Sequence, residues 1–145
     1  MDVSELRKRI LRAIDDARKD ASDRRVVVDE ASKAYATFLS QIAVPLLRQS
    51  AIVLNATGAQ FVVHTPAGTA RLASERSPDT FVEFELDAAR PNPEVIGRIS
   101  LARGGRQGQL IEERPVVPSK AVDKLTEDDV SAFLVAEIPK LVVKP

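Results

Sequence analysis

The sequence predicts an α+β domain with a helical first third, a five-stranded antiparallel meander and a closing C-terminal helix. Residues 1–44 contain neither Gly nor Pro and place apolar residues at intervals of three and four, which is the spacing of one helix face. After residue 58 apolar residues alternate with polar ones and Gly or Pro recurs at short intervals, a pattern typical of consecutive antiparallel strands. A capping signal at Thr126 then opens a final helix.

The helical segment, residues 1–56, begins at an N-cap expected at Ser4. Its apolar pattern lapses at residues 20–25 and then resumes. We interpret the lapse as a corner near Asp23 that separates two helices of a hairpin. The alternative is one long helix of more than 40 residues, whose exposed apolar face would need a packing partner. Pro45 is expected to bend or restart the helix.

Five strands are expected in the segment 57–118, and the short turns between them favour a meander over parallel crossovers. Within 81–88, Val82, Phe84 and Leu86 point to one face and alternate with acidic residues on the other. Pro115 indicates an edge strand. The expected strands are 61–65, 70–74, 81–88, 95–103 and 110–116.

The remaining segment, 119–145, contains the closing helix and a tail. Thr126 with Asp129 three residues later forms the predicted capping box, and Val130 begins the apolar face of the helix. Pro139 is expected to end the regular helix, so that 141–143 would dock as an extended tail.

Composition excludes several classes of function. The chain of 145 residues has no cysteine, which removes disulfides, thiol catalysis and cysteine-held metal centres, and we expect no cofactor. Its 21 basic and 21 acidic residues balance, so charge gives no reason to expect a nucleic-acid or membrane partner. The N-terminus lacks the apolar run of a signal peptide, and the apolar run 42–47 is too short to span a bilayer. We therefore expect a cytoplasmic protein.

Three features could carry chemistry, and each has a simpler structural interpretation. His64 is the only histidine, and no nucleophile motif accompanies it, so a strand-end position near solvent is the simpler interpretation. Glu83, Glu85 and Asp87 share one strand face, which is also what a solvent-facing strand looks like. The hairpin 102–109, with Arg103 and Arg106, resembles no phosphate-binding pattern.

These observations support two hypotheses of different kinds. The first is a non-enzymatic interaction or scaffold domain that forms a homodimer through its N-terminal helices. The residues expected at that interface are Leu6, Ile10, Ala13, Ala17, Ala31, Ala34 and Phe38. The alternative is a small-ligand-binding protein or enzyme with a pocket between the helices and the sheet. Its polar candidates are His64, Arg71, Glu83, Glu85 and Arg98.

Overall fold

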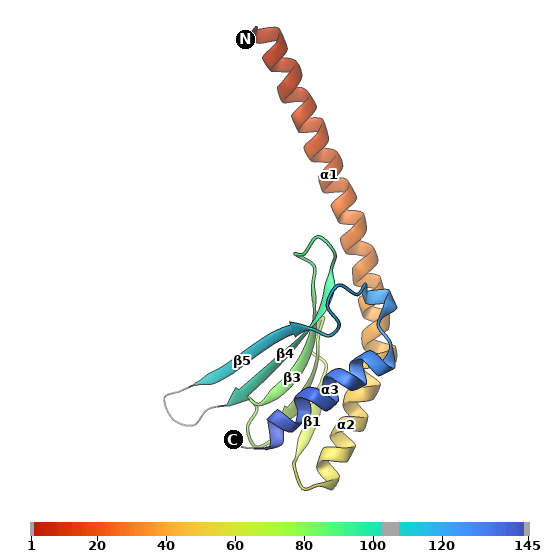
Figure 1. Ribbon diagram of the computed structural model, residues 1–145, viewed down its shortest axis with the longest axis vertical. Coiled ribbons are helices and arrows are strands. Elements are labelled where there is room, and N and C mark those ends of the chain that lie inside the picture. Colours follow the sequence, from red (N-terminus) through yellow and green to blue (C-terminus); the bar gives the residue numbers. More distant parts are fainter. Residues whose placement is uncertain (1, 103–107, 144–145) are drawn as a thin grey trace.

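The computed structural model describes residues 2–102 and 108–143. It contains a long N-terminal helix, a five-stranded antiparallel sheet and a C-terminal helix, which confirms the predicted α+β class. Figure 1 shows the sheet and the C-terminal helix gathered around the lower half of the N-terminal helix, whose upper half extends beyond them. The predicted basic hairpin 102–109 lies largely outside the described residues.

The N-terminal helix runs in one direction through α1 (Val3–Phe38), a π-helical turn (Leu39–Ala43) and α2 (Val44–Ala56). The predicted corner near Asp23 is therefore wrong, and the alternative of one long helix is correct. The lapse at residues 20–25 removes apolar side chains, but it contains no Gly or Pro, so nothing in it breaks the backbone hydrogen bonds of a helix. The N-cap is Asp2, whose side chain accepts a hydrogen bond from the Ser4 backbone N–H.

Pro45 is accommodated by the π-helical turn that precedes it. Proline has no N–H to donate, so an α-helical hydrogen bond is lost at this position. Here the backbone N–H of Val44 reaches the carbonyl oxygen of Leu39, five residues back, and α2 then begins with Pro45 in its first turn. The helix restarts at Pro45 without reversing the chain.

The sheet is a meander in which every strand pairs with its sequence neighbours. Each strand lies within one or two residues of its predicted range, and Pro115 is on the edge strand β5, as predicted. The strands are β1 (Phe61–His64), β2 (Ala70–Ser74), β3 (Phe81–Asp87), β4 (Glu94–Ala102) and β5 (Gln109–Pro115).

After a 3-10 turn (Val122–Lys124), α3 (Glu127–Val142) closes the chain. The predicted capping box is present: Thr126 accepts from the Asp129 N–H, and Asp129 accepts from the Thr126 N–H. The predicted extended tail at 141–143 is wrong, because α3 continues through Pro139 to Val142. Pro139 cannot donate to the carbonyl oxygen of Val135, so α3 loses one hydrogen bond there. The helix nevertheless continues, and the backbone N–H of Val143 donates to the Pro139 carbonyl oxygen.

Helices α2 and α3 cover the same face of the sheet, α2 over β1 and β2 and α3 over β3 and β4. Gly97 on β4 makes the contact with α3 possible, since a Cβ added there would overlap the ring of Phe133. The space between helices and sheet is filled by buried apolar side chains that include Leu47, Leu72, Val82, Phe84, Ile99, Val130 and Phe133.

Candidate functional site

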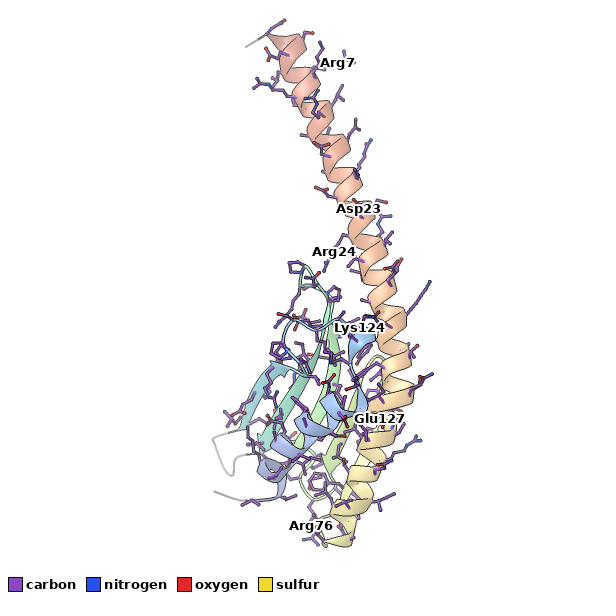
Figure 2. The ribbon with its side chains drawn as sticks, turned by 45° about the vertical axis from the view of Figure 1, so that its right-hand side comes forward. Arg7, Asp23, Arg24, Arg76, Lys124 and Glu127 are labelled. Atoms are coloured by element: carbon purple, nitrogen blue, oxygen red, sulfur yellow. The ribbon has the colours of Figure 1, made fainter. Side chains whose placement is uncertain are left out.

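The N-terminal part of α1 extends beyond the other described elements of the protein. Every residue from Val3 to Asp23 is exposed, and we call this segment the free arm. At 1.5 Å per residue it extends about 30 Å. Figure 2 shows it passing from Asp23 to Arg7 and beyond with no other element beside it.

Arg24 is the point at which the helix meets the sheet. Its guanidinium donates to the carbonyl oxygen of Pro91 at 2.7 Å and also contacts the carbonyl oxygens of Ala88 and Arg90. All three acceptors belong to the loop between β3 and β4. The planar fork of arginine suits several acceptors at once, so this side chain holds the loop against α1 at the base of the free arm.

A single apolar stripe runs along α1 on both sides of Arg24. Intervals of three and four continue without interruption from Val3 to Phe38, with Asp20 and Arg24 as the charged members. This is the heptad spacing of helices that pack side by side. Its members are Val3, Leu6, Ile10, Ala13, Ala17, Asp20, Arg24, Val27, Ala31, Ala34 and Phe38.

The two halves of the stripe have different surroundings. Beyond Arg24 it turns towards the protein itself: Val27 is still 40% exposed, but Ala31 and Ala34 are half-buried, and Phe38 is 3% exposed in the core. Before Arg24 it faces solvent, and Leu6 and Ile10 are 47% and 49% exposed. The sheet and its loops cover only the second half.

The predicted interface residues divide along the same line. Leu6, Ile10, Ala13 and Ala17 lie on the free arm. Ala31 and Ala34 line a cavity beside the 119–123 segment, and the Phe38 ring packs against Tyr35 and Phe84. Phe38 is thus occupied by contacts within the chain, and Ala31 and Ala34 face the 119–123 segment across the cavity. The free arm is the part of the stripe that these segments leave exposed.

The polar candidates lie on the sheet face that the helices leave uncovered. His64, Arg71, Glu83 and Arg98 form one row across the strands, and Glu85 lies beside that row, two residues from Glu83 on β3. His64 pairs with Arg71, Arg71 with Glu83, and Glu83 with Arg98 in the strand register. The row ends at Glu113, the register partner of Arg98 on β5. The structure thus brings together residues from all five strands.

The interpretation of Glu83 as a solvent-facing residue is wrong. It is 3% exposed, and its carboxylate accepts from Arg71 at 2.6 Å and contacts Arg98 at 3.4 Å. Arg98 also donates to Glu85 at 2.5 Å and to Glu113 at 2.7 Å. The hydrogen bond with Glu113 and the nearby carboxylates raise the pKa of Arg98 above its ordinary value, although burial acts in the opposite direction.

This row of ion pairs is a structural element of the sheet. Each arginine faces at least one carboxylate, so the charges are neutralised within the row, and cross-strand pairs of opposite charge stabilise a sheet. His64 sits at the exposed end of β1 beside the cationic Arg71, which cannot orient it as a carboxylate would orient a catalytic base. Among residues 2–102 and 108–143, no acidic or histidine cluster could hold a metal ion.

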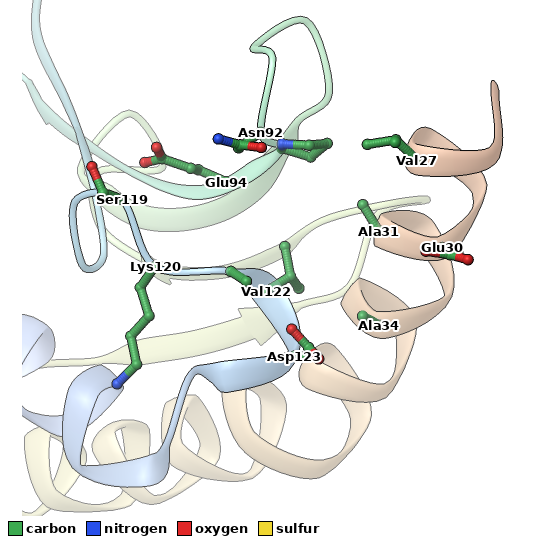
Figure 3. Close-up of a pocket in the computed structure, with 12 residues that line it drawn as sticks. Val27, Glu30, Ala31, Ala34, Asn92, Glu94, Ser119, Lys120, Val122 and Asp123 are labelled. Atoms are coloured by element: carbon green, nitrogen blue, oxygen red, sulfur yellow. The ribbon is translucent and has the colours of Figure 1, made fainter. Parts of the chain in front are cut away.

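A cavity of about 470 Å³ separates α1 from the segments 92–94 and 119–123 (Figure 3). Ala31, Ala34 and Val122 form an apolar wall, while polar side chains stand around them. Lys120 is engaged by Asp129 at 2.6 Å, and Glu94 lies 3.6 Å from Arg90. Of the ionic residues that line this cavity, Lys120 and Glu94 therefore have charged partners within the chain.

A second, more apolar hollow is a groove of about 420 Å³ that runs between α2 and α3 and includes the exposed Val53 and Val135.

By length and composition, the helix Val3–Ala56 contains a stretch apolar enough to cross a membrane. Core helices of soluble proteins meet the same criterion of length and composition. The α2 part of Val3–Ala56 buries Leu47, Ala51 and Leu54 in the core.

Sequence reasoning missed two residues in these sites. Arg24 falls within the lapse of the apolar pattern, although the interval of seven from Ala17 and to Ala31 marks it as a member of the stripe. Glu113 could have been found from strand alternation, given the register that opposes it to Arg98.

Comparison with protein-family models, curated proteins and solved structures finds no match to this chain.

Proposed function

We propose that this protein is a self-associating interaction domain, and that a second copy of the chain covers the apolar stripe of its free arm. The observation that carries this proposal is the uncovered half of a continuous stripe. Leu6 and Ile10 are 47% and 49% exposed on a part of the helix that extends beyond the sheet. Most of the stability of such helices comes from packing an apolar face against another element.

Pairing of two free arms supplies that packing. Burial of a Leu, Ile or Val side chain contributes about 1.5–3 kcal/mol when it is complete, and a symmetric pair buries each residue twice. The charges of the arm do not oppose association, because it carries six basic and five acidic side chains. Two copies therefore approach with little net repulsion.

The alternative of a ligand pocket between the helices and the sheet has no comparable support. That space is filled by core side chains such as Leu72, Phe84 and Phe133. The five polar candidates lie on the opposite face of the sheet, four of them in ion pairs with one another or with Glu113. We therefore favour interaction over catalysis.

Sedimentation equilibrium of the full chain at micromolar concentration tests the proposal. We expect a dimer for the unmodified protein and a monomer for Ile10→Glu, because two glutamates would be buried in the pair. The matched control is Val26→Glu. Val26 is similarly exposed, at 54%, but lies about 160° around the helix from Ile10.

The control variant should remain a dimer, and circular dichroism should show that both variants are folded. Ile10 is 49% exposed on the free arm and is not part of the core, so its substitution leaves the core intact. A monomeric unmodified chain, or equal association by the Ile10→Glu and Val26→Glu variants, would remove the proposal.

A further inference from the structure

The free arm is divided into two halves of opposite charge. Residues 3–12 contain four basic side chains and one acidic one, a net charge of +3, whereas residues 13–23 contain four acidic and two basic ones, a net charge of −2. Two arms that run in the same direction would place like charges together along their length. Two arms in opposite directions place each basic half beside an acidic half.

The sizes of the stripe residues are divided in the same way. Val3, Leu6 and Ile10 occupy the first half, while Ala13 and Ala17 occupy the second. A parallel pair would set large residues against large ones at one end and alanine against alanine at the other, so the helices would diverge. An antiparallel pair can set Leu6 and Ile10 against the partner's alanines, which keeps a more even spacing between the helices.

The contact at Arg24 limits how far two arms can overlap. The loop between β3 and β4 lies against α1 there, so a second helix has to end before that point. If Ile10 lies opposite the partner's Ala13, then Leu6 lies opposite the partner's Ala17 and Val3 opposite the partner's Asp20. If the two arms overlapped by one more heptad, Val3 would lie opposite the partner's Val27. The end of the arm would then collide with the partner's loop between β3 and β4.

We propose that the free arms of two copies pair antiparallel in this register, with the two sheets at opposite ends of the pair. The inference rests on the proposed self-association and specifies its geometry. In this arrangement Arg9 and the partner's Asp16 flank the same layer of the interface between the two arms. Opposite charges at such flanking positions select the orientation of paired helices. Twofold symmetry repeats each of these contacts.

Cysteine cross-linking distinguishes the two orientations, since the natural chain contains no cysteine. Chains carrying Leu6→Cys are mixed with chains carrying Ala17→Cys. The mixture is left until the subunits have exchanged between dimers and is then oxidised in a glutathione buffer. In the antiparallel register the mixed pair is adjacent, whereas the two substituted positions in a pair of identical Leu6→Cys chains are about 16 Å apart along the helix. A disulfide needs Cα atoms within about 7 Å, so we expect at least roughly a tenfold excess of mixed over identical disulfides.

A parallel pair would give the reverse result, with Leu6→Cys chains linking readily to one another. That outcome overturns the antiparallel register and leaves self-association standing. A chain that sediments as a monomer and forms no disulfide in either mixture overturns both proposals.

A charge exchange provides a second readout that does not depend on oxidation. We expect Arg9→Asp to weaken dimerisation about threefold to tenfold, by adding a like charge beside the partner's Asp16. Asp16→Arg in the same chain should restore it. Failure of the second substitution to restore association would contradict the register.

Discussion

The guanidinium of Arg24 donates a hydrogen bond of 2.7 Å to the carbonyl oxygen of Pro91, 67 residues further along the chain. Together with its contacts to Ala88 and Arg90, this bond fixes the loop between β3 and β4 to the long helix. It also marks where the covered part of the helix ends and the free arm begins.

Arg24→Lys is expected to loosen this loop. A lysine ammonium lacks the planar fork that serves several carbonyl oxygens, and loss of hydrogen bonds to a charged donor costs about 1–2 kcal/mol. Urea unfolding should show the lower stability, and amide exchange at residues 88–90 and 92 of the loop should become faster. Arg25→Lys, at the exposed neighbouring position, is the control. Equal behaviour of the two variants would show that the contact has no energetic role.

Glu83→Gln is expected to destabilise the sheet. The substitution keeps the shape of the side chain but leaves Arg71 and Arg98 without their shared carboxylate. Breaking a buried ion pair costs about 3–5 kcal/mol, and partial exposure of both arginines reduces this to about 1–3 kcal/mol. Glu113→Gln, at an exposed position, should cost less than about 1 kcal/mol. Chemical unfolding of both variants measures the difference, and equal losses would refute it.

Gly97→Ala is expected to displace α3. A Cβ at this position would overlap the ring of Phe133, and overpacking of a core costs about 1–3 kcal/mol. The same substitution in a Phe133→Leu background should cost less, because the ring that clashes has been removed. Unfolding free energies of the four chains give this coupling directly. A coupling near zero would mean that the ring does not limit residue 97.

Tyr35 should resist ionisation until the protein unfolds. Burial, and secondarily the charges of Glu85 and Glu83, raise the pKa of its hydroxyl, which donates to the carbonyl oxygens of Gly68 and Phe84. The unfolded chain ionises near pH 10, so stability is retained below about pH 10 and falls as the pH rises further. Tyr35 is the only tyrosine and there is no tryptophan, so absorbance at the tyrosinate band reports this group alone. A tyrosinate signal that precedes the loss of helix would contradict the expectation.

Glu137 is expected to contribute to acid sensitivity. Burial opposes its ionisation, but hydrogen bonds from Lys140 and Arg114 outweigh burial and lower the pKa of this carboxyl. Its stabilising contribution is therefore present above the unfolded value, about 4.3, and is lost as the pH falls through the lower folded value. Glu137→Gln should make stability less dependent on pH between about pH 5 and pH 3. Urea unfolding across this range tests it, and parallel pH profiles would contradict it.

Local patterns were enough to predict most of the fold. Alternation in 81–88 and the Pro- and Gly-containing turns placed all five strands, because short antiparallel connections leave little topological choice. The capping box at Thr126 was also correct. Errors occurred where an interruption was given too much weight: the charged lapse at Asp23 and the proline at 139 both lie inside helices.

The candidate sites were less predictable. Glu83 looked like a solvated residue because its neighbours on the strand are acidic, and only the register reveals the arginines on β2 and β4 that bury it. The predicted interface residues were identified as one stripe along the helix. Helical spacing alone could not show which half of that stripe the rest of the protein would cover.

The sequence by itself determined the helix, the strands, their order and the position of the apolar stripe, because these depend on spacing and backbone chemistry within short segments. Tertiary structure alone decided that the stripe becomes covered between Ala31 and Phe38 and is exposed before Arg24. That division depends on where the loop after β3 returns to α1, a contact between residues 67 positions apart.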